Sequence, residues 1–424
     1  MQSAGSLLSR QFGSLRVYNY RLYFFGQMIS LVGTWMQTTG QAYLVLKLTG
    51  SAAALGTVTA LQFLPITLFT LFGGVFADRW PKRRMLIITQ TLALFQALAL
   101  GLLVATDSVE LWHVYVLAAC LGTINALDAP VRQTFAVELV GRDQLVNAVA
   151  LNSSIFNVAR IAGPGVAGLT IAYVGMASTF FINAGSFVFV IVAYLLMRPG
   201  EFYVSAKRLA KGNALSQVAE GIRYSVKTPS LLFLFIMLAA IGTFGFNFTV
   251  VIPLIAEFVL KVGPERFGLL TACMGAGSLG AALVLAATGR ASMRTLVVAA
   301  LAFSVLLGAI ALSRSFALTA ALLVLFGVSS LVFSTTINTT LQISVPDELR
   351  GRVMSIFFLL MAGSTPIGGA LTGYMADHIG VPRTIGIDAA ICAAGVIAAL
   401  MYRASVGGAR VREEPPALES LASR

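Results

Sequence analysis

The sequence predicts an all-α polytopic membrane protein whose twelve transmembrane helices form two pseudo-symmetric bundles of six. Composition is the first observation behind this fold class: 58% of the 424 residues are hydrophobic and only 11% are charged. Soluble domains carry about one quarter charged residues, so a soluble chain of this composition could not cover its surface with polar groups. The apolar residues also lie in runs long enough to cross a bilayer, and the two halves of the chain repeat each other.

Twelve apolar runs supply the predicted spans. Those before the longest polar break cover 18–47, 51–77, 82–105, 110–138, 144–174 and 176–197, and those after it cover 229–260, 264–289, 293–313, 316–345, 350–378 and 382–403. A helix of about 20 residues crosses ~30 Å of hydrocarbon. We therefore predict an N-terminal six-helix bundle over 18–197 and a C-terminal one over 229–403, with both termini on the same side.

The basic residues indicate which side faces the cytoplasm. Of the 29 Lys and Arg residues, those in loops opposite the termini are Lys47, Lys261, Arg266, Arg314 and Arg383. Arg132 and Arg160 lie inside spans, and the others lie on the side of the termini. Cytoplasmic loops carry the excess of Lys and Arg, so both termini are expected in the cytoplasm. The net charge of +12 is explained by topology, and we expect no nucleic-acid partner.

Three polar segments flank or separate the bundles. Residues 1–17 have no signal-peptide pattern and are expected to form a short cytoplasmic arm. Residues 198–228 form the linker, in which Leu215, Val218, Ile222 and Val226 recur at helical spacing. This spacing predicts an amphipathic helix on the cytoplasmic face of the membrane. The tail, 404–424, is polar and is expected to be disordered.

Cysteine and histidine usage argues against several kinds of site. Cys120, Cys273 and Cys392 each lie in a separate apolar run, and His113 and His378 are the only histidines. This spacing predicts neither a zinc site nor a disulfide framework. We therefore expect no metal, no cofactor and no enzymatic activity. The sequence also has no GxxxxGK[ST] motif for ATP, which leaves an ion gradient as the energy source.

The halves of the chain match at corresponding places. The residues Asp143–Leu145 (DQL) match Asp347–Leu349 (DEL), and Pro164 with the following GLT matches Pro366 with ALT. Internal repeats of this kind are common in transporters built from related bundles. Two related six-helix bundles around a central axis are the simplest interpretation.

The stretch GGVFADRWPKRR, residues 73–84, lies between the second and third spans. It resembles the signature G-x-x-x-D-R-x-x-[RK]-[RK] of the major facilitator superfamily, supplied here by Gly74, Asp78, Arg79, Arg83 and Arg84, with Pro81 where a glycine is expected. The segments NYRLYFFGQMISLVGTWMQ, NALDAPVRQTF and FNVARIAGP resemble the bacterial exporter branch that includes the enterobactin exporter and macrolide-efflux-type proteins. The resemblance covers Tyr20 to Arg403.

The resemblance implies export of a small organic molecule, a siderophore, macrolide or other drug-like compound, across a bacterial inner membrane. Protons are the expected coupling ion, and alternating access by a monomer is the expected mechanism. A lysophospholipid flippase or nutrient importer of the same fold stays an alternative. A membrane receptor or scaffold without transport is a further one.

The charged signature is expected to act as a conformational latch. At the cytoplasmic end of its span, Asp78 could accept hydrogen bonds from the start of the helix at 350–378 and pair with Arg132. Such contacts need the two bundles close together at the cytoplasmic side, so they would favour the outward-open state. The alternative is that the arginines only enforce topology.

The fifth span contains RIAGPGVAG, which resembles the antiporter motif of proton-coupled exporters through Gly163, Pro164 and Gly168. Glycine and proline inside a span allow close helix packing or a bend. Packing against the small residues of 275–282 is one expectation. A role in sealing the outer side and favouring export is the other.

Two charged residues lie deep inside predicted spans, where charge is costly and normally faces a cavity or a partner. Asp128 has Arg132 four residues later, a spacing that brings side chains together on a helix. It is expected either to form that local pair or to carry the proton. Arg160 is expected to attract an anionic group of the substrate or to pair with Asp128. Glu257 and Asp388 lie nearer the span ends, within reach of water, and are weaker candidates for the proton path.

Polar residues in several spans are expected to line the substrate or proton cavity. They are Gln27, Thr34, Gln37, Asn125, Asn157, Asn247, Ser334 and Asn338. The 28 phenylalanines suit an amphiphilic aromatic or lipophilic substrate.

The latch hypothesis predicts the effect of one substitution. Asp78→Asn should leave the protein folded in the membrane but reduce export severely, because the outward-open state would lose a charge-assisted contact. A change of 1.4 kcal/mol shifts the population about tenfold. Export by an Asp78→Asn variant, measured at matched protein levels, checks this. Wild-type export would refute the latch.

Overall fold

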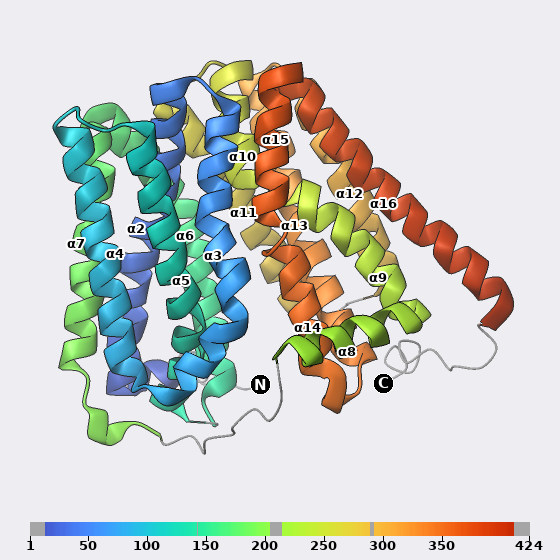
Figure 1. Ribbon diagram of the computed structural model, residues 1–424, viewed down its shortest axis with the longest axis horizontal. Helices are drawn as coiled ribbons and strands as arrows, with labels where there is room; N and C mark the ends of the chain where they lie inside the picture. The colour runs from blue at the N-terminus through green and yellow to red at the C-terminus, as the bar shows by residue number, and fades with distance from the viewer. Residues whose placement is uncertain (1–12, 142, 204–213, 289–291, 411–424) are drawn as a thin grey trace, which may run out of the picture. The chain divides into compact units, whose positions relative to one another are not determined.

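A computed structural model describes residues 13–141, 143–203, 214–288 and 292–410 (Figure 1). Within these ranges, no side chain is described at 69–79, 146, 214–218, 286, 288, 347–348 or 407–410. Every regular element in the described part is helical. The all-α fold class predicted from the sequence is therefore confirmed.

The first six predicted spans each form one helix. After a 3₁₀ turn, η1 (Gly13–Arg16), they are α2 (Tyr18–Thr49), α3 (Ala52–Arg79), α4 (Lys82–Ala105), α5 (Leu111–Val140), α6 (Leu145–Tyr173) and α7 (Met176–Leu196). The turn between α2 and α3 follows from local chemistry. Gly50 takes the left-handed conformation, with φ 60°, which glycine adopts without steric cost. Ser51 then caps α3 by accepting the amide of Ala54 at 3.1 Å.

The linker contains η2 (Pro199–Glu201) and α8 (Ala214–Lys227), so the predicted linker helix is present. The seventh predicted span is broken into α9 (Pro229–Ala240), the π-helical segment η3 (Ile241–Gly245), α10 (Phe248–Leu254) and a second π-helical segment, η4 (Ile255–Val259). Segments of π-helix inside α-helices often occur at functional sites. This break was not predicted.

The remaining spans complete the chain. They are α11 (Pro264–Thr288), α12 (Met293–Leu312), α13 (Phe316–Ser344), the pair α14 (Asp347–Met361) and α15 (Thr365–Ile379), and α16 (Val381–Arg410). The pair α14–α15 corresponds to a single predicted span, 350–378. The helix α16 continues past residue 403, where the tail was predicted to begin, and residues 411–424 lie outside the description.

Length and apolarity support a membrane location. In the described part of the chain, nine helices are long and apolar enough to cross a membrane, or ten if the bent pair Ala219–Lys227 and Pro229–Gly245 is one span. The described apolar stretch of α3 is shorter, Ala52–Leu68. The helix α2 has 32 residues but carries several glutamines. Those polar residues belong to the site described below.

The chain divides into two compact units. The first comprises residues 1–54, 61–210 and 262–272, and the second comprises 55–60, 211–261 and 273–424. In the first unit, α2 packs against α6 and α7, and α4 packs against α5 and α7 (Figure 1). In the second unit, α12 packs against α13 and α16, and α16 also packs against α9.

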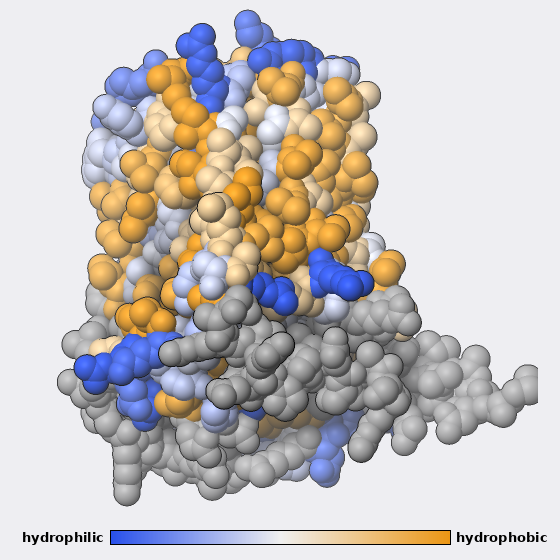
Figure 2. Space-filling view, turned by 90° about the vertical axis from the view of Figure 1, so that its right-hand side faces the viewer, coloured by the Kyte–Doolittle hydropathy of each residue, from blue (hydrophilic) through white to orange (hydrophobic). Residues whose placement is uncertain are grey.

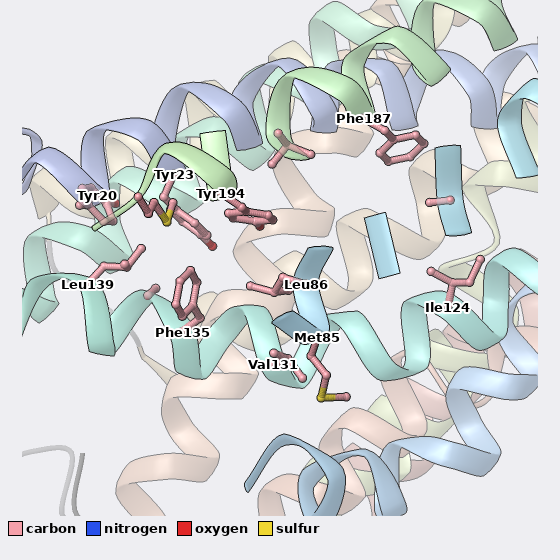
Figure 3. Close-up of a cluster of buried hydrophobic side chains, with 14 of the residues drawn as sticks. Tyr20, Tyr23, Met85, Leu86, Ile124, Val131, Phe135, Leu139, Phe187 and Tyr194 are labelled. Atoms are coloured by element: carbon pink, nitrogen blue, oxygen red, sulfur yellow. The ribbon is translucent and has the colours of Figure 1, made fainter. Parts of the chain in front are cut away.

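An aromatic cluster forms the core of the first unit near one end of its helices. Tyr23 of α2 lies edge-on to Phe135 of α5, with ring centroids 6.3 Å apart. Phe135 makes the same kind of contact with Tyr194 of α7, at 6.1 Å. Leu86 of α4 is fully buried beside them (Figure 3). These contacts join four helices, and Tyr194 also borders the polar site.

The outer faces of the helices are apolar. Val298, Val305 and Leu312 of α12 are 65%, 68% and 80% exposed, and Met401 of α16 is 67% exposed. Figure 2 shows hydrophobic side chains over much of one face, with hydrophilic side chains gathered at its upper end. The three α12 side chains recur every seven residues, about two helical turns, and such an exposed apolar stripe is expected where lipid is the solvent.

Glycine allows α11 and α13 to approach closely within the second unit. A Cβ atom at Gly277 would overlap the carbonyl oxygen of Val324. The hydroxyl of Ser278 donates to the carbonyl oxygen of Gly327 at 3.0 Å. The small residues of 275–282, predicted to pack on the fifth span, thus lie against α13 at Gly277 and Ser278.

This packing predicts different effects of one substitution at two glycines of α11. Gly277→Ala should destabilise the protein by about 1–3 kcal/mol, the usual range for overpacking. Gly280→Ala is the matched control, because a Cβ atom there would meet nothing within 4 Å. Thermal unfolding of the purified variants in detergent tests this. Equal unfolding temperatures for the two variants would contradict the described packing.

Candidate functional site

Asp128 of α5 is the centre of a buried polar cluster in the first unit. Only 2% of the residue is exposed. Its Oδ1 accepts hydrogen bonds from Thr89 Oγ1 at 2.6 Å and from Gln90 Nε2 at 2.9 Å, both from α4. Its Oδ2 lies 3.4 Å from Nε of Arg132, one helical turn away. Three groups therefore compensate its charge.

Arg132 extends the cluster to two further helices. Its Nη1 donates to Oε1 of Gln27 on α2 at 3.1 Å. The amide of Gln27 then donates to the hydroxyl of Tyr194 on α7 at 2.7 Å. The side chain of Arg132 is 30% exposed, whereas Gln27 and Tyr194 are buried. One chain of polar contacts thus links α5, α2 and α7.

A second polar chain lies along the same helices. Gln37 of α2 donates to Oε1 of Gln96 on α4 at 2.8 Å, and its own Oε1 accepts from Asn183 of α7 at 2.6 Å. Ser186 donates to Oδ1 of Asn183 at 3.1 Å. Gly33 leaves room for these contacts, since a Cβ there would lie 2.5 Å from both Asn183 Oδ1 and Ser186 Oγ.

In these two chains, the buried polar side chains form hydrogen bonds with one another inside the first unit. The hydrocarbon core of a bilayer supplies no water for them, and an unpaired buried polar group is costly. Gln27, Gln37 and Asp128 were predicted site residues, and the structure gives each of them hydrogen-bond partners on other helices. Asp128 forms the local pair with Arg132 that the sequence left as one of two alternatives.

Arg160 of α6 is a second basic residue deep inside a span of the first unit, and it lies outside the Asp128 cluster. Its Nη2 lies 3.5 Å from Oδ1 of Asn157, and its Nε is buried without a hydrogen-bond partner among the described residues. Asn157 itself donates to the carbonyl oxygen of Ser153 at 2.8 Å. Asp128 pairs with Arg132, so the described contacts leave Arg160 with a neutral neighbour. The predicted pairing of Arg160 with Asp128 is not observed.

In the second half of the charged signature (residues 73–84), Arg83 makes contacts within the first unit. Nε and Nη2 of Arg83 donate to the carbonyl oxygens of Tyr194 and Leu195 at 2.6 and 2.9 Å. These carbonyl groups lie in the last turn of α7, where the helix leaves them unpaired. Arg84 is exposed. The side chains of Gly74, Asp78 and Arg79 lie outside the described residues, so the latch stays a prediction.

The glycine-rich motif of α6 packs inside the first unit. A Cβ at Gly163 would lie 2.9 Å from the carbonyl oxygen of Val32 on α2. At Gly168 a Cβ would lie 3.0 Å from Cα of Glu265, at the start of α11. Pro164 is buried inside the same helix. The motif therefore serves close packing, and its role in sealing one side of the membrane stays a prediction.

The second unit contains a buried carboxyl group, Asp388, that has fewer polar partners than Asp128. Asp388 of α16 is 1% exposed, although we expected it to reach water. Its Oδ2 accepts from Thr372 Oγ1 of α15 at 3.1 Å, and its Oδ1 has no partner among the described residues. Asn247, the residue before α10, is fully buried. Its amide donates to the carbonyl oxygen of Thr243 at 2.7 Å, and its Oδ1 is also unpartnered.

The remaining predicted residues make contacts within their own helices or lie half-buried. Thr34 donates to the carbonyl oxygen of Ser30 at 2.9 Å, and Ser334 donates to that of Leu331 at 3.2 Å. Asn338 accepts from Gln342. Asn125 and Glu257 are half-buried. None of these described contacts joins them to the Asp128 cluster.

Several residues of the Asp128 cluster and of the second polar chain were not predicted from the sequence. They are Thr89, Gln90, Gln96, Asn183, Ser186 and Tyr194. The available signal was the presence of amide and hydroxyl side chains inside apolar runs of α4 and α7. In a bilayer such residues are expected to face other helices and to bond across them.

The sequence is similar to proteins of known family. A family model described as "Transmembrane secretion effector" matches residues 9–416. The staphyloferrin A transporter of Staphylococcus aureus is 27% identical over 374 residues, 86% of this chain and 91% of that protein. The multidrug efflux pump Tap of Mycolicibacterium fortuitum is 28% identical over 392 residues, 90% and 95%. Macrolide efflux protein A of Streptococcus pyogenes is 22% identical over 372 residues, 86% and 91%.

Solved structures share the fold. The nucleoside transporter NupG superposes with a TM-score of 0.69 at 13% identity, covering 92% of this chain and 98% of that one. A bacterial homologue of the human lysosomal transporter Spinster gives a TM-score of 0.69 at 13% identity, covering 92% and 95%. At such identities the likeness shows the fold alone.

The Asp128–Arg132 pair predicts a non-additive pair of substitutions. Asp128→Asn should lower the free energy of unfolding by as much as about 3 kcal/mol, because it leaves Arg132 uncompensated in a buried cluster. The double variant Asp128→Asn/Arg132→Gln should recover most of this loss. Unfolding in detergent, followed for both single variants and the double variant, measures the coupling.

The exposed ion pair between Arg198 and Glu201, at 3.2 Å, supplies the control. Exposed pairs contribute little to stability, roughly 0–1 kcal/mol, so Glu201→Gln should unfold close to the wild type. If the effects of Asp128→Asn and Arg132→Gln simply add, the pair is not energetically coupled.

Proposed function

This chain belongs to the major facilitator transporters described as transmembrane secretion effectors, and on that premise we propose that it exports a small acidic organic molecule in exchange for protons. Its relatives are siderophore, multidrug and macrolide transporters, and it is an export transporter of their type. The acidic substrate class and the proton coupling are the additional elements of this proposal.

Arg160 is the observation that carries the substrate class. It lies near the middle of α6, a helix of the first unit, and its guanidinium has no carboxylate partner among the described residues. A charged group at this depth normally faces a cavity or a partner. An acidic group of a substrate would supply charge-assisted hydrogen bonds that Asn157 does not. A siderophore, or another drug-like compound with a carboxylate, has the required chemistry.

Export, rather than import, is supported by the relatives. The names of two of them contain "efflux". A flippase or importer of the same fold stays the alternative to this proposal.

Protons are the proposed driving ion. Among the described carboxylates within spans, Asp128 and Asp388 are the most deeply buried, and Glu257 is half-buried; these are the groups proposed to bind them. We further propose that the protein acts as a monomer in the bacterial inner membrane with both termini in the cytoplasm. The distribution of Lys and Arg between the two sides supports this orientation.

Inverted membrane vesicles test the proposal. Uptake of a carboxylate siderophore, a macrolide and a cationic dye is measured with and without an imposed pH gradient. We expect uptake of the acidic compound to collapse with the gradient. Uptake that does not depend on the gradient, or transport of lysolipid in its place, would refute proton-coupled export.

Substitution of Arg160 tests the acidic substrate class. Arg160→Ala should reduce uptake of the carboxylate siderophore about tenfold or more, because a hydrogen bond to a charged group contributes about 1.5–3 kcal/mol. Uptake of neutral or cationic compounds should change less, and Arg160→Lys should retain part of the acidic uptake.

The matched control is Arg383→Ala, which removes an exposed arginine from α16. It should leave uptake of all three compounds near the wild-type rate. If Arg160→Ala reduces uptake of acidic, neutral and cationic compounds equally, Arg160 does not select an anionic group.

A further inference from the structure

We propose that Asp388 is the carboxyl group that takes up and releases the transported proton, and that it is held as the neutral acid in the packing described here. This inference rests on the proposed proton-coupled export. It assigns the coupling role to Asp388 in the second unit, in place of Asp128.

The two buried aspartates have different surroundings. Asp128 has a cation at 3.4 Å and two further donors on its other oxygen. Asp388 has one donor, the hydroxyl of Thr372, and its Oδ1 is unpartnered among the described residues. An ionised carboxylate in an apolar region needs a counter-charge or several hydrogen bonds. Asp128 has both, whereas Asp388 has neither.

No neighbouring helix brings a described basic side chain to Asp388. The helix α16 packs against α9, α12, α15, η3 and η4, and α9 and η3 contain no titratable residue. In α12, the basic residue Arg294 lies fourteen residues from Gly308, roughly 21 Å along the helix. Gly308 is the position that faces Ala389, next to Asp388. At the other end, Arg314 follows α12 and donates to the carbonyl oxygens of Ala311 and Ser313.

The remaining titratable groups on these elements point elsewhere or carry no positive charge. On α16, Arg383 is exposed and lies roughly 140° around the helix from Asp388, while Cys392 follows one turn later. Tyr402 and Arg403 lie fourteen and fifteen residues from Asp388, roughly 21 Å or more along the helix, and Arg403 lies over the ring of Phe233. On α15, the side chains of Tyr374, Asp377 and His378 are exposed, whereas Thr372 faces Asp388. On η4, Glu257 is half-buried and acidic. The described surroundings of Asp388 thus favour its neutral form.

Asp388 also borders the broken seventh span. One turn before Thr372 on α15, a Cβ at Gly368 would lie 2.7 Å from Nδ2 of Asn247, at the end of the break. One turn after Asp388 on α16, Sγ of Cys392 would lie 3.3 Å from a Cβ at Gly245 of η3. The carboxyl group of Asp388 therefore lies between α15 and α16, and each of these helices contacts the broken span about one turn away from it.

This placement connects protonation with packing. When Asp388 gives its proton to water, the carboxylate that remains needs water or a cation. The packed contact between α15, α16 and η3 supplies neither, so the ionised form favours separation of these elements. Proton uptake from water restores the neutral acid and the packed contact. A ligand that binds only one of two states shifts the equilibrium between them, and here that ligand is the proton.

The substitutions Asp388→Asn and Asp128→Asn test whether each aspartate is neutral or charged in the folded protein. Asp388→Asn replaces a neutral acid by a neutral amide of similar shape, so the full-length protein should unfold in detergent at nearly the wild-type temperature. The matched variant Asp128→Asn removes a paired charge and should unfold at a lower temperature. If Asp388→Asn unfolds as early as Asp128→Asn, or fails to fold, the carboxylate requires its charge and the inference is wrong.

Transport separates the proton role from a structural one. In inverted vesicles, Asp388→Asn should lower gradient-driven accumulation of the carboxylate siderophore more than tenfold, while exchange of the same compound across the membrane continues, since exchange moves no net proton. Accumulation by Asp388→Asn equal to the wild type, or loss of exchange together with accumulation, overturns the role of Asp388. If the wild type accumulates the compound without a gradient, the proposed proton coupling fails instead, and the unfolding comparison still decides the charge of Asp388.

Discussion

The hydrocarbon core of the bilayer contains no water to satisfy polar groups, so each buried donor, acceptor or charge must find a partner inside the protein. The first unit meets this requirement with side chains from four helices. Asp128, Arg132, Gln27 and Tyr194 form one chain of contacts, and Gln37, Gln96 and Asn183 form another. These side-chain hydrogen bonds link the helices α2, α4, α5 and α7 to one another.

The first unit has one described exception, Nε of Arg160, and the second unit has more. Among its described residues, Asn247 Oδ1, Thr336 Oγ1 and Asp388 Oδ1 are buried without hydrogen-bond partners. Two of these atoms lie beside the π-helical break of the seventh span. Unsatisfied buried groups call for a specific explanation. For Oδ1 of Asp388, the proposed explanation is that this carboxyl group changes its protonation state. We infer that the two units play different parts: the first supplies a hydrogen-bonded polar core, and the second supplies the group proposed to change its charge.

Much of the fold could be predicted from the sequence because hydrophobic runs report directly on a bilayer. The pairing of Asp128 with Arg132 was also accessible, since it depends only on a spacing of four residues along one helix. The hydrogen bonds from Thr89 and Gln90 were not, because they depend on how α4 packs against α5. The π-helical break coincides with Gly242, Gly245 and Asn247, but the run of 229–260 is apolar enough to be predicted as one continuous span. Asp388 was expected near water because of its place in the sequence, whereas the rotation of α16 directs it toward Thr372.

The infrared spectrum of the purified protein tests the contrast between the two aspartates most directly. A protonated carboxyl group in an apolar environment gives a C=O stretching band that a carboxylate does not give. At neutral pH the wild type should show this band, Asp128→Asn should retain it, and Asp388→Asn should lose it. A wild-type spectrum without the band, or a band that survives Asp388→Asn, would contradict the assignment of a neutral acid at Asp388.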